Sequence, residues 1–248
     1  MTVPSDSNPN DETLNGASYW APEEVDSALD TMKADGLILV MGDIGYGLFG
    51  TSEPAIAKMY RLKGRPLTNP CIFVGNLDIV DEIAVIQQPE VRKWIEEVAG
   101  WTTLAIVLPA RTTSRYLESM DPWVRQQSVT NGSLAIFLRT GPYLEQVIAR
   151  AFHEGWVFVG SSANKSLTGN VFRFDDLPPD IISGADLAVD HGVGTLINPE
   201  RRATTMVNFT NWTIRRQGVN HEQIKASFEK LKARVSRLPG ADAEDGTN

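Results

Sequence analysis

The sequence predicts a mixed α/β fold with a strongly twisted sheet, because helical and strand-like segments alternate early and strand-like segments cluster late. A second observation is the composition. The chain has 248 residues, of which 42% are hydrophobic and 22% charged. These are ordinary values for a globular protein, so a wholly disordered, collagen-like or coiled-coil chain is excluded.

The first predicted helix follows Trp20. Pro22 suits a first helical turn, and Gly36 is expected to end the helix. Its apolar residues recur at helical spacing: Val25, Leu29 and Met32. This pattern predicts an amphipathic helix packed on the sheet.

The middle of the chain alternates between short apolar runs and longer amphipathic segments. Strands are predicted at residues 37–41, 71–74, 104–108, 134–138 and 156–160. Helices are predicted at about 54–63, with Ser52 as its cap, and at 90–98, 116–127 and 142–153. Late strands are predicted at 186–189, 204–209 and 212–216.

A last helix is predicted near residues 220–236. One apolar stripe runs along it, formed by Ile224, Phe228, Leu231 and Val235. Such a stripe is typical of a helix that packs on the core, and this interpretation is favoured over a partner-binding helix.

The predicted domain organisation is one folded unit between two polar ends. We expect a disordered arm at residues 1–19, a domain at 20–218, a C-terminal helix within 219–238 and a disordered tail at 239–248. No internal repeat or long linker divides the central unit.

Charge and cysteine content limit the class of protein. The 23 Lys and Arg against 31 Asp and Glu give a formal net charge of −8, which argues against charge-driven nucleic-acid binding over the whole surface but leaves room for a local basic cleft. The single cysteine, Cys71, excludes an internal disulfide. With no secretory signal pattern and no apolar run of membrane-spanning length, we expect a cytoplasmic protein with no membrane partner.

The glycine-rich run Gly45-Tyr46-Gly47-Leu48-Phe49-Gly50 matches G-x-G-x-x-G after a predicted strand. A dinucleotide fold would also need an acidic residue at the tip of the second strand, where Val74-Gly75-Asn76 stands. The favoured interpretation of the run is a tight turn whose glycines allow close backbone packing.

Three polar motifs are candidates for ligand binding. Lys63-Gly64-Arg65-Pro66 places two cations at a helix end, where they could hold phosphate or carboxylate or simply be solvated. Ser161-Ser162-Ala163-Asn164 follows a predicted strand, which is a common place for ligand sites in α/β proteins. Hydroxyls at Thr204 and Thr205 and a cation at Arg216 come near the end of the fold. No histidine spacing typical of a zinc site is present.

Taken in order, these segments resemble the Sua5/YrdC/YciO family over about residues 22–218. The family pattern P-T-[DE]-T-x-Y-G-L corresponds to Met41–Leu48, and K-x-R-P corresponds to Lys63–Pro66. Further matches are Gly100–Thr103 to G-P-x-T, Ser161–Asn164 to T-S-A-N, Thr204–Asn208 to S-T-x-x-D, and Arg216 to the closing arginine. Each motif is short, and their shared order makes the resemblance specific.

The resemblance implies a twisted mixed sheet with flanking helices around a large, positively charged cleft. It also implies a threonylcarbamoyl-AMP synthase, a nucleotidyltransferase that uses ATP, bicarbonate and L-threonine in tRNA N6-threonylcarbamoyladenosine formation, with Mg²⁺ accompanying the triphosphate. Lys63 and Arg65 would then be catalytic, and the nucleotide would contact Thr103, Ser162, Asn164 and Arg216. The remaining substrate would contact Tyr46, Ser161, Thr204 and Thr205. No residue is expected to hold a resident metal.

Several positions depart from the family pattern. Gly42 and Ile44 replace its two threonines, and Phe137 stands where its strand carries an arginine. Two alternatives therefore stay open: carbamoyl or adenylate chemistry on a different amine in a more apolar pocket, and a non-catalytic module that binds nucleotide or RNA in the same cleft.

Overall fold

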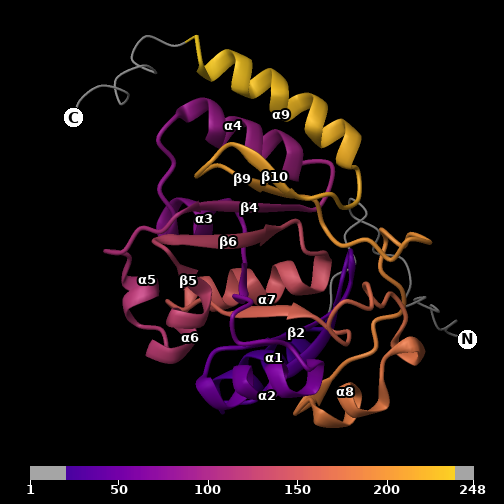
Figure 1. Ribbon diagram of the computed structural model, residues 1–248. Helices are drawn as coiled ribbons and strands as arrows, with labels where there is room; N and C mark the ends of the chain where they lie inside the picture. Colours follow the sequence, from indigo (N-terminus) through magenta and orange to yellow (C-terminus); the bar gives the residue numbers. More distant parts are fainter. Residues whose placement is uncertain (1–20, 238–248) are drawn as a thin grey trace, which may run out of the picture.

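Ten strands form one mixed sheet in the computed structural model, which describes residues 21–237 (Figure 1). The strands are β1 (Ile38–Gly42), β2 (Gly45–Gly50), β3 (Ile72–Val74), β4 (Leu104–Pro109), β5 (Val129–Thr130), β6 (Ser133–Leu138), β7 (Val159–Ser162), β8 (Leu187–Ala188), β9 (Met206–Asn208) and β10 (Thr213–Arg216). Their order across the sheet is β10-β9-β4-β6-β3-β7-β2-β1-β8, with β5 paired to β6 outside this path. Parallel pairs (β1 with β8, β3 with β6, β4 with β9) occur among antiparallel ones, so the predicted mixed α/β sheet is confirmed.

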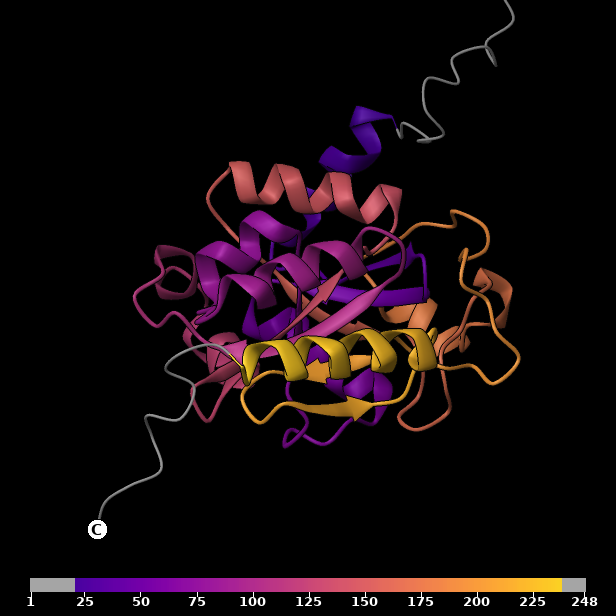
Figure 2. The same ribbon diagram turned by 90° about the horizontal axis from the view of Figure 1, so that it is seen from above.

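Helices surround the sheet (Figures 1 and 2). They are α1 (Pro22–Lys33), α2 (Glu53–Lys63), α3 (Leu77–Ile83), α4 (Pro89–Ala99), α5 (Arg115–Glu118), α6 (Pro122–Ser128), α7 (Pro142–His153), α8 (Pro179–Gly184) and α9 (His221–Val235), with a 3-10 turn at Phe174–Asp176. Helices α1 and α7 pack together against β1, and α2 packs against β2. In the described part of the chain, no helix is long and apolar enough to cross a membrane.

The C-terminal helix α9 belongs to the same hydrophobic core as the sheet. It packs against α4, and its stripe residues Ile224, Phe228, Leu231 and Val235 are buried. Phe228 lies within an aromatic cluster with Trp94, Phe209 and Trp212. The prediction of a core-packing helix is confirmed.

The glycine-rich run is a strand and not the predicted tight turn, although its glycines do allow the close packing that was expected of them. Residues 45–50 form β2, which pairs antiparallel with β1. The turn is at Asp43 and Ile44, and Gly45 has a φ of +108°. A dinucleotide-binding unit joins its first strand to a helix, so the hairpin overturns the G-x-G-x-x-G reading.

Several further elements differ from their predictions. The helix predicted at 116–127 is two helices, because Pro122 cannot continue a helix interior and the Asp121 carboxylate caps α6 by accepting from Trp123 and Val124 N–H. The strand predicted at 156–160 is shifted to β7, where pairing with β2 takes Ser161 and Ser162 into the strand. Helix α3 was not predicted.

The predicted disordered arm at residues 1–19 and tail at 239–248 lie outside the described residues.

Candidate functional site

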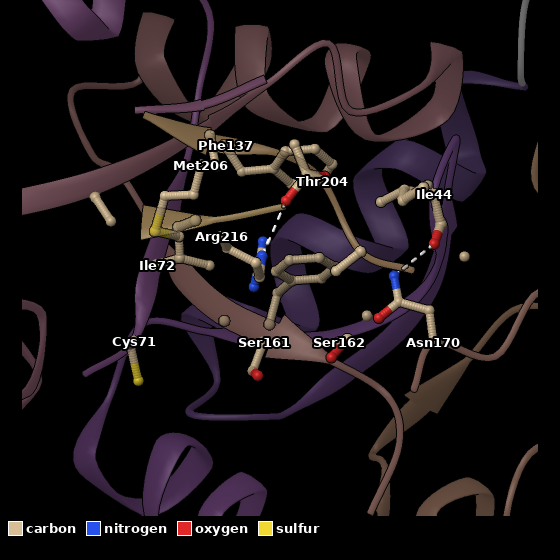
Figure 3. A pocket seen from close by; sticks show the side chains of 18 of the residues that line it. Ile44, Cys71, Ile72, Phe137, Ser161, Ser162, Asn170, Thr204, Met206 and Arg216 are labelled. Atoms are coloured by element: carbon tan, nitrogen blue, oxygen red, sulfur yellow. Dashed lines mark hydrogen bonds between the residues drawn. The ribbon is translucent and has the colours of Figure 1, made fainter. Parts of the chain in front are cut away.

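A cavity of about 380 Å³ opens beside the glycine-rich strands at the centre of the sheet (Figure 3). Its lining comes from the β1–β2 hairpin, β3, β4, β6, β7, β9 and β10, together with the segment that follows α2. Three arginines line it, and none of its lining residues is an aspartate or glutamate. The cavity is therefore cationic in a chain whose net charge is −8.

Glycines create the space in one wall of the cavity. A side chain at Gly47 would place its Cβ 2.4 Å from the Phe49 ring, and one at Gly160 would place it 2.2 Å from the Leu48 carbonyl oxygen. The Phe49 ring therefore lies over positions that only glycine can occupy. These glycines allow the Phe49 ring to line the cavity. The glycine-rich run at residues 45–50 therefore shapes a cavity wall and does not form a dinucleotide-binding turn.

The cationic side of the cavity is formed by Arg65, Arg215 and Arg216. Arg65 is held by the carbonyl of Pro70, to which its Nη2 donates at 2.8 Å. Arg216 Nε donates to the Thr204 carbonyl at 2.9 Å. Burial and then the nearby charges of Arg65 and Arg215 lower the pKa of Arg216, although part of its side chain stays open to the cavity. An anion bound here would relieve this repulsion.

Consecutive residues of a regular strand point to opposite faces of the sheet, yet Arg215 and Arg216 both line the cavity. The register of β10 against β9 shifts between Ile214 and Arg216. Such a bulge changes the direction in which side chains point. The bulge therefore explains why both Arg215 and Arg216 face the cavity.

Hydroxyl groups lie beside these cations. Ser161 and Ser162 on β7 and Thr204 before β9 all line the cavity. The Ser162 hydroxyl donates to the side-chain oxygen of Asn164. Oxygen-rich ligands such as phosphates are commonly held by this combination of hydroxyls and arginines.

Ile44 and Asn170 lie together at one end of the cavity, away from Cys71 and Ile72 (Figure 3). The Asn170 Nδ2 donates to the Ile44 carbonyl at 2.8 Å, which leaves its amide oxygen as an acceptor. The Tyr46 hydroxyl lies within hydrogen-bonding distance of Asp190 Oδ1 and the Gly192 carbonyl, both at 2.9 Å. Burial, then Asp190, raises the pKa of Tyr46, so it stays protonated.

The structure places Lys63 behind the cavity wall. Its side chain is 2% exposed, and its ammonium donates to the carbonyls of Ser162 and Asn164, the latter at 2.7 Å. Burial, and secondarily the charge of Arg65, lowers the pKa of Lys63 to about 7. In this arrangement Lys63 fixes the end of β7 and the segment after it, and its ammonium does not reach the cavity.

Three other predicted residues also lie outside the cavity lining. Thr103 is fully buried, and its hydroxyl has no hydrogen-bond partner among the described residues. Asn164 belongs to the buried network around Lys63. The Thr205 hydroxyl donates to the Val219 carbonyl and accepts from Gly218 N–H, so it joins β9 to the start of α9. The structure thus brings together six of the ten predicted residues: Tyr46, Arg65, Ser161, Ser162, Thr204 and Arg216.

Sequence reasoning did not assign a site role to several lining residues, among them Arg215, Asn170, Phe49 and Met206. Arg215 stands next to the predicted Arg216, but the alternation of a regular strand would turn its side chain away from the cavity. Nothing local in the sequence marks Asn170, which reaches the cavity through its pairing with Arg201 and Ile44.

Metal ligands are scarce in this part of the molecule. Within residues 21–237, no group of three or more His, Cys, Asp or Glu side chains could hold a metal ion. Because the cavity lining has no carboxylate, the oxygen ligands that Mg²⁺ prefers are missing from it.

The fold and the cavity define a mixed α/β domain with an arginine-lined, glycine-walled binding site. The chain belongs to the Sua5/YciO/YrdC family: the model of that family, described as "Telomere recombination", matches residues 30–218. The resemblance predicted from the motifs is confirmed.

Solved structures show the same fold. A hypothetical protein, smu.1377c from Streptococcus mutans UA159, superimposes with a TM-score of 0.70 at 15% identity, covering 86% of this chain and 92% of that one. P. abyssi Sua5 complexed with L-threonine gives a TM-score of 0.63 at 19% identity, covering 81% of this chain and 56% of that one. E. coli YciO gives 0.60 at 15% identity, with coverages of 82% and 93%. No curated protein sequence matches the chain.

Proposed function

We propose that this protein is a nucleotidyltransferase that joins a carbamate to the α-phosphate of ATP and releases pyrophosphate. The observation that carries the proposal is the cavity charge: Arg65, Arg215 and Arg216 converge on it, and no carboxylate opposes them. Three uncompensated cations in a chain of net charge −8 favour a polyanionic ligand of small size.

Family membership supports nucleotide chemistry at this position. The family resemblance implies ATP, bicarbonate and L-threonine as substrates, and one structure with the same fold is a Sua5 with bound L-threonine. This chain spans only 56% of that Sua5, so the comparison bears on the domain rather than on the whole relative. A role in tRNA threonylcarbamoyladenosine formation is the corresponding biological proposal.

The reaction balances without a redox step. An amine and bicarbonate condense to a carbamate with loss of water. A carbamate oxygen then attacks the α-phosphorus, the bond to the β-phosphate oxygen breaks, and pyrophosphate leaves. Arg65 and Arg216 would neutralise the charge that develops on the phosphates, while Ser161, Ser162 and Thr204 orient their oxygens. Asn170 would accept a hydrogen bond from the carbamate N–H.

We expect magnesium at this site only as an ion bound to the ATP substrate. The cavity lining offers no carboxylate, so the residues present do not fit a resident Mg²⁺. An ion bound to the triphosphate would arrive as MgATP.

One observation favours a second candidate, a module that binds nucleotide without turnover. Lys63, one of the two cations that the family motif supplies, donates to backbone carbonyls behind the wall. RNA in the same local basic cleft is the other ligand that such a module could take.

The test is pyrophosphate release from ATP and bicarbonate with each of the twenty amino acids in turn. Release that depends on both bicarbonate and an amino acid supports the enzyme. ATP binding without release under any of these conditions would contradict it and favour the binding module.

A further inference from the structure

Part of the cavity lining is apolar. Gly42, Ile44, Ala135, Phe137 and Leu144 all belong to the lining, and none of them carries a side-chain hydrogen-bonding group. A Cβ at Gly42 would lie 2.6 Å from the Thr140 carbonyl, so the end of β1 closely approaches the segment between β6 and α7. That approach places Gly42 beside the part of the chain that carries Phe137 and Leu144.

Two polar groups of the cavity lining, Tyr46 and Asn170, already have partners. The Tyr46 hydroxyl lies 2.9 Å from both Asp190 Oδ1 and the Gly192 carbonyl, and burial, then Asp190, raises the pKa of Tyr46, so that its hydroxyl stays protonated. Asn170 uses its Nδ2 on the Ile44 carbonyl, which leaves one amide oxygen to accept an N–H. A ligand hydroxyl placed against Ile44 would find both of these groups engaged, and burying it there without another partner is unfavourable.

Resting on the proposed function, we infer that the amine carbamoylated by this protein is an α-amino acid with a branched aliphatic side chain, represented by valine, rather than threonine. The arginines then bind the phosphates, and the Asn170 oxygen accepts a hydrogen bond from the N–H of the amine. The aliphatic side chain of the substrate packs against Ile44, Phe137 and Leu144. Ile44 is the specificity-determining residue.

Valine and threonine are the sharpest pair of probes because they are nearly isosteric, a methyl in one replacing the hydroxyl of the other. A site built to bond a hydroxyl rejects the analogue that lacks it by about 10⁴-fold or more, whereas an apolar pocket disfavours an added hydroxyl by only about 10²-fold. The direction and the size of the preference therefore report which kind of site is present.

The experiment compares valine with threonine as substrates for the full chain, with ATP and bicarbonate, by kcat/KM for pyrophosphate release. Calorimetric titration of the same two amino acids into the ATP-saturated protein provides a readout that needs no turnover. We expect valine to be preferred by about 10- to 100-fold in either measurement. Ile44→Thr should reduce that ratio at least tenfold while the affinity for ATP stays unchanged.

Ile197→Thr is the matched control, since Ile197 is 52% exposed and does not line the cavity. It should leave the valine-to-threonine ratio as in the wild type. A threonine preference, equal use of the two, or binding of neither by the ATP-saturated protein would overturn the inference. Threonine-dependent release would overturn the inference and still uphold the proposed function. Valine binding without release of pyrophosphate from any amine would overturn the proposed function, and would leave only a binding preference for valine.

Discussion

Arg216 lines the cavity beside two other cations: burial, and then the nearby charges of Arg65 and Arg215, lower its pKa. We expect Arg216→Ala to weaken ATP binding by at least tenfold while the melting temperature changes little, since removing one of three like charges relieves repulsion. Calorimetric titration of ATP measures the first quantity and thermal unfolding the second. Arg234→Ala on the exposed face of α9 is the matched control. Equal ATP affinities in the two variants would remove Arg216 from the site.

The lowered pKa of Lys63 predicts that the free energy of unfolding depends on pH. Its folded-state pKa of about 7 lies below the ordinary value of about 10.5 in the unfolded chain. Between these two values the unfolded state binds more protons, so stability rises with pH by at most about 1.4 kcal/mol per pH unit. Below about pH 7 both states are protonated and the full cost of burying the charge remains. The carbonyl acceptors of the ammonium work against this shift.

Replacing the ammonium by a methylthioether should remove that dependence. Urea unfolding of wild type and Lys63→Met at pH 6.5 and pH 9 measures it, and the wild type should gain stability relative to the variant at the higher pH. Parallel behaviour of the two proteins across this range would show that Lys63 keeps an ordinary pKa.

The site was predictable residue by residue where a polar motif lies at or beside the end of a regular element. Ser161, Ser162 and Thr204 were found because polar residues at strand ends face binding sites. Lys63 was expected in the cavity, but its position is set by carbonyls of Ser162 and Asn164, about a hundred residues away in the chain. The direction of the Arg215 side chain depends on a bulge in β10, and no local sequence pattern predicts that bulge.

The packing of β2 on β7 depends on glycine. We expect Gly160→Ala to destabilise the fold by about 3 kcal/mol, because its Cβ would meet the Leu48 carbonyl oxygen at 2.2 Å and the Phe49 ring at 2.3 Å. Chemical denaturation measures the loss. Gly64→Ala is a useful comparison, since nothing lies within 4 Å of that Cβ and only its φ of +59° opposes the change, by about 1 kcal/mol. A smaller loss at Gly160 than at Gly64 would contradict the account of this wall.

Individual elements were predicted well where the hydrophobic periodicity agrees with the residues that begin and end helices and strands. The helix predicted at 142–153 coincides with α7, and the strand predicted at 134–138 with all but one residue of β6. The errors fall where tertiary pairing decides: β2 looked like a turn because six residues with three glycines have weak strand propensity, and its neighbours β1 and β7 supply the pairing that makes it a strand.

The C-terminal helix extends the core beyond the residues that match the family. Phe228 is fully buried against Trp94, Phe209 and Trp212. Phe228→Ala should therefore cost about 3–5 kcal/mol of unfolding free energy in a single cooperative transition. Denaturant unfolding followed by circular dichroism and by tryptophan fluorescence measures it. Two separate transitions in the wild type would show instead that α9 folds independently of the sheet.

The overall architecture followed from the sequence because the alternation of elements and the order of the short motifs agree with each other. The strand order did not, since the parallel pairs β3 with β6 and β4 with β9 join segments separated by many residues. The cavity forms where these non-local pairs meet, so its apolar side and its third arginine emerged only from the folded structure.

Following carbon from bicarbonate into a nucleotide shows whether the protein transfers a carbamate to ATP. The full chain is incubated with ATP, ¹³C-bicarbonate and the twenty amino acids, and the nucleotides are analysed by mass spectrometry together with pyrophosphate release. The account predicts an AMP adduct that carries the ¹³C label and one amino acid, in amounts equal to the pyrophosphate formed. ATP that is bound but unchanged, or converted to ADP and phosphate without a labelled adduct, would contradict it.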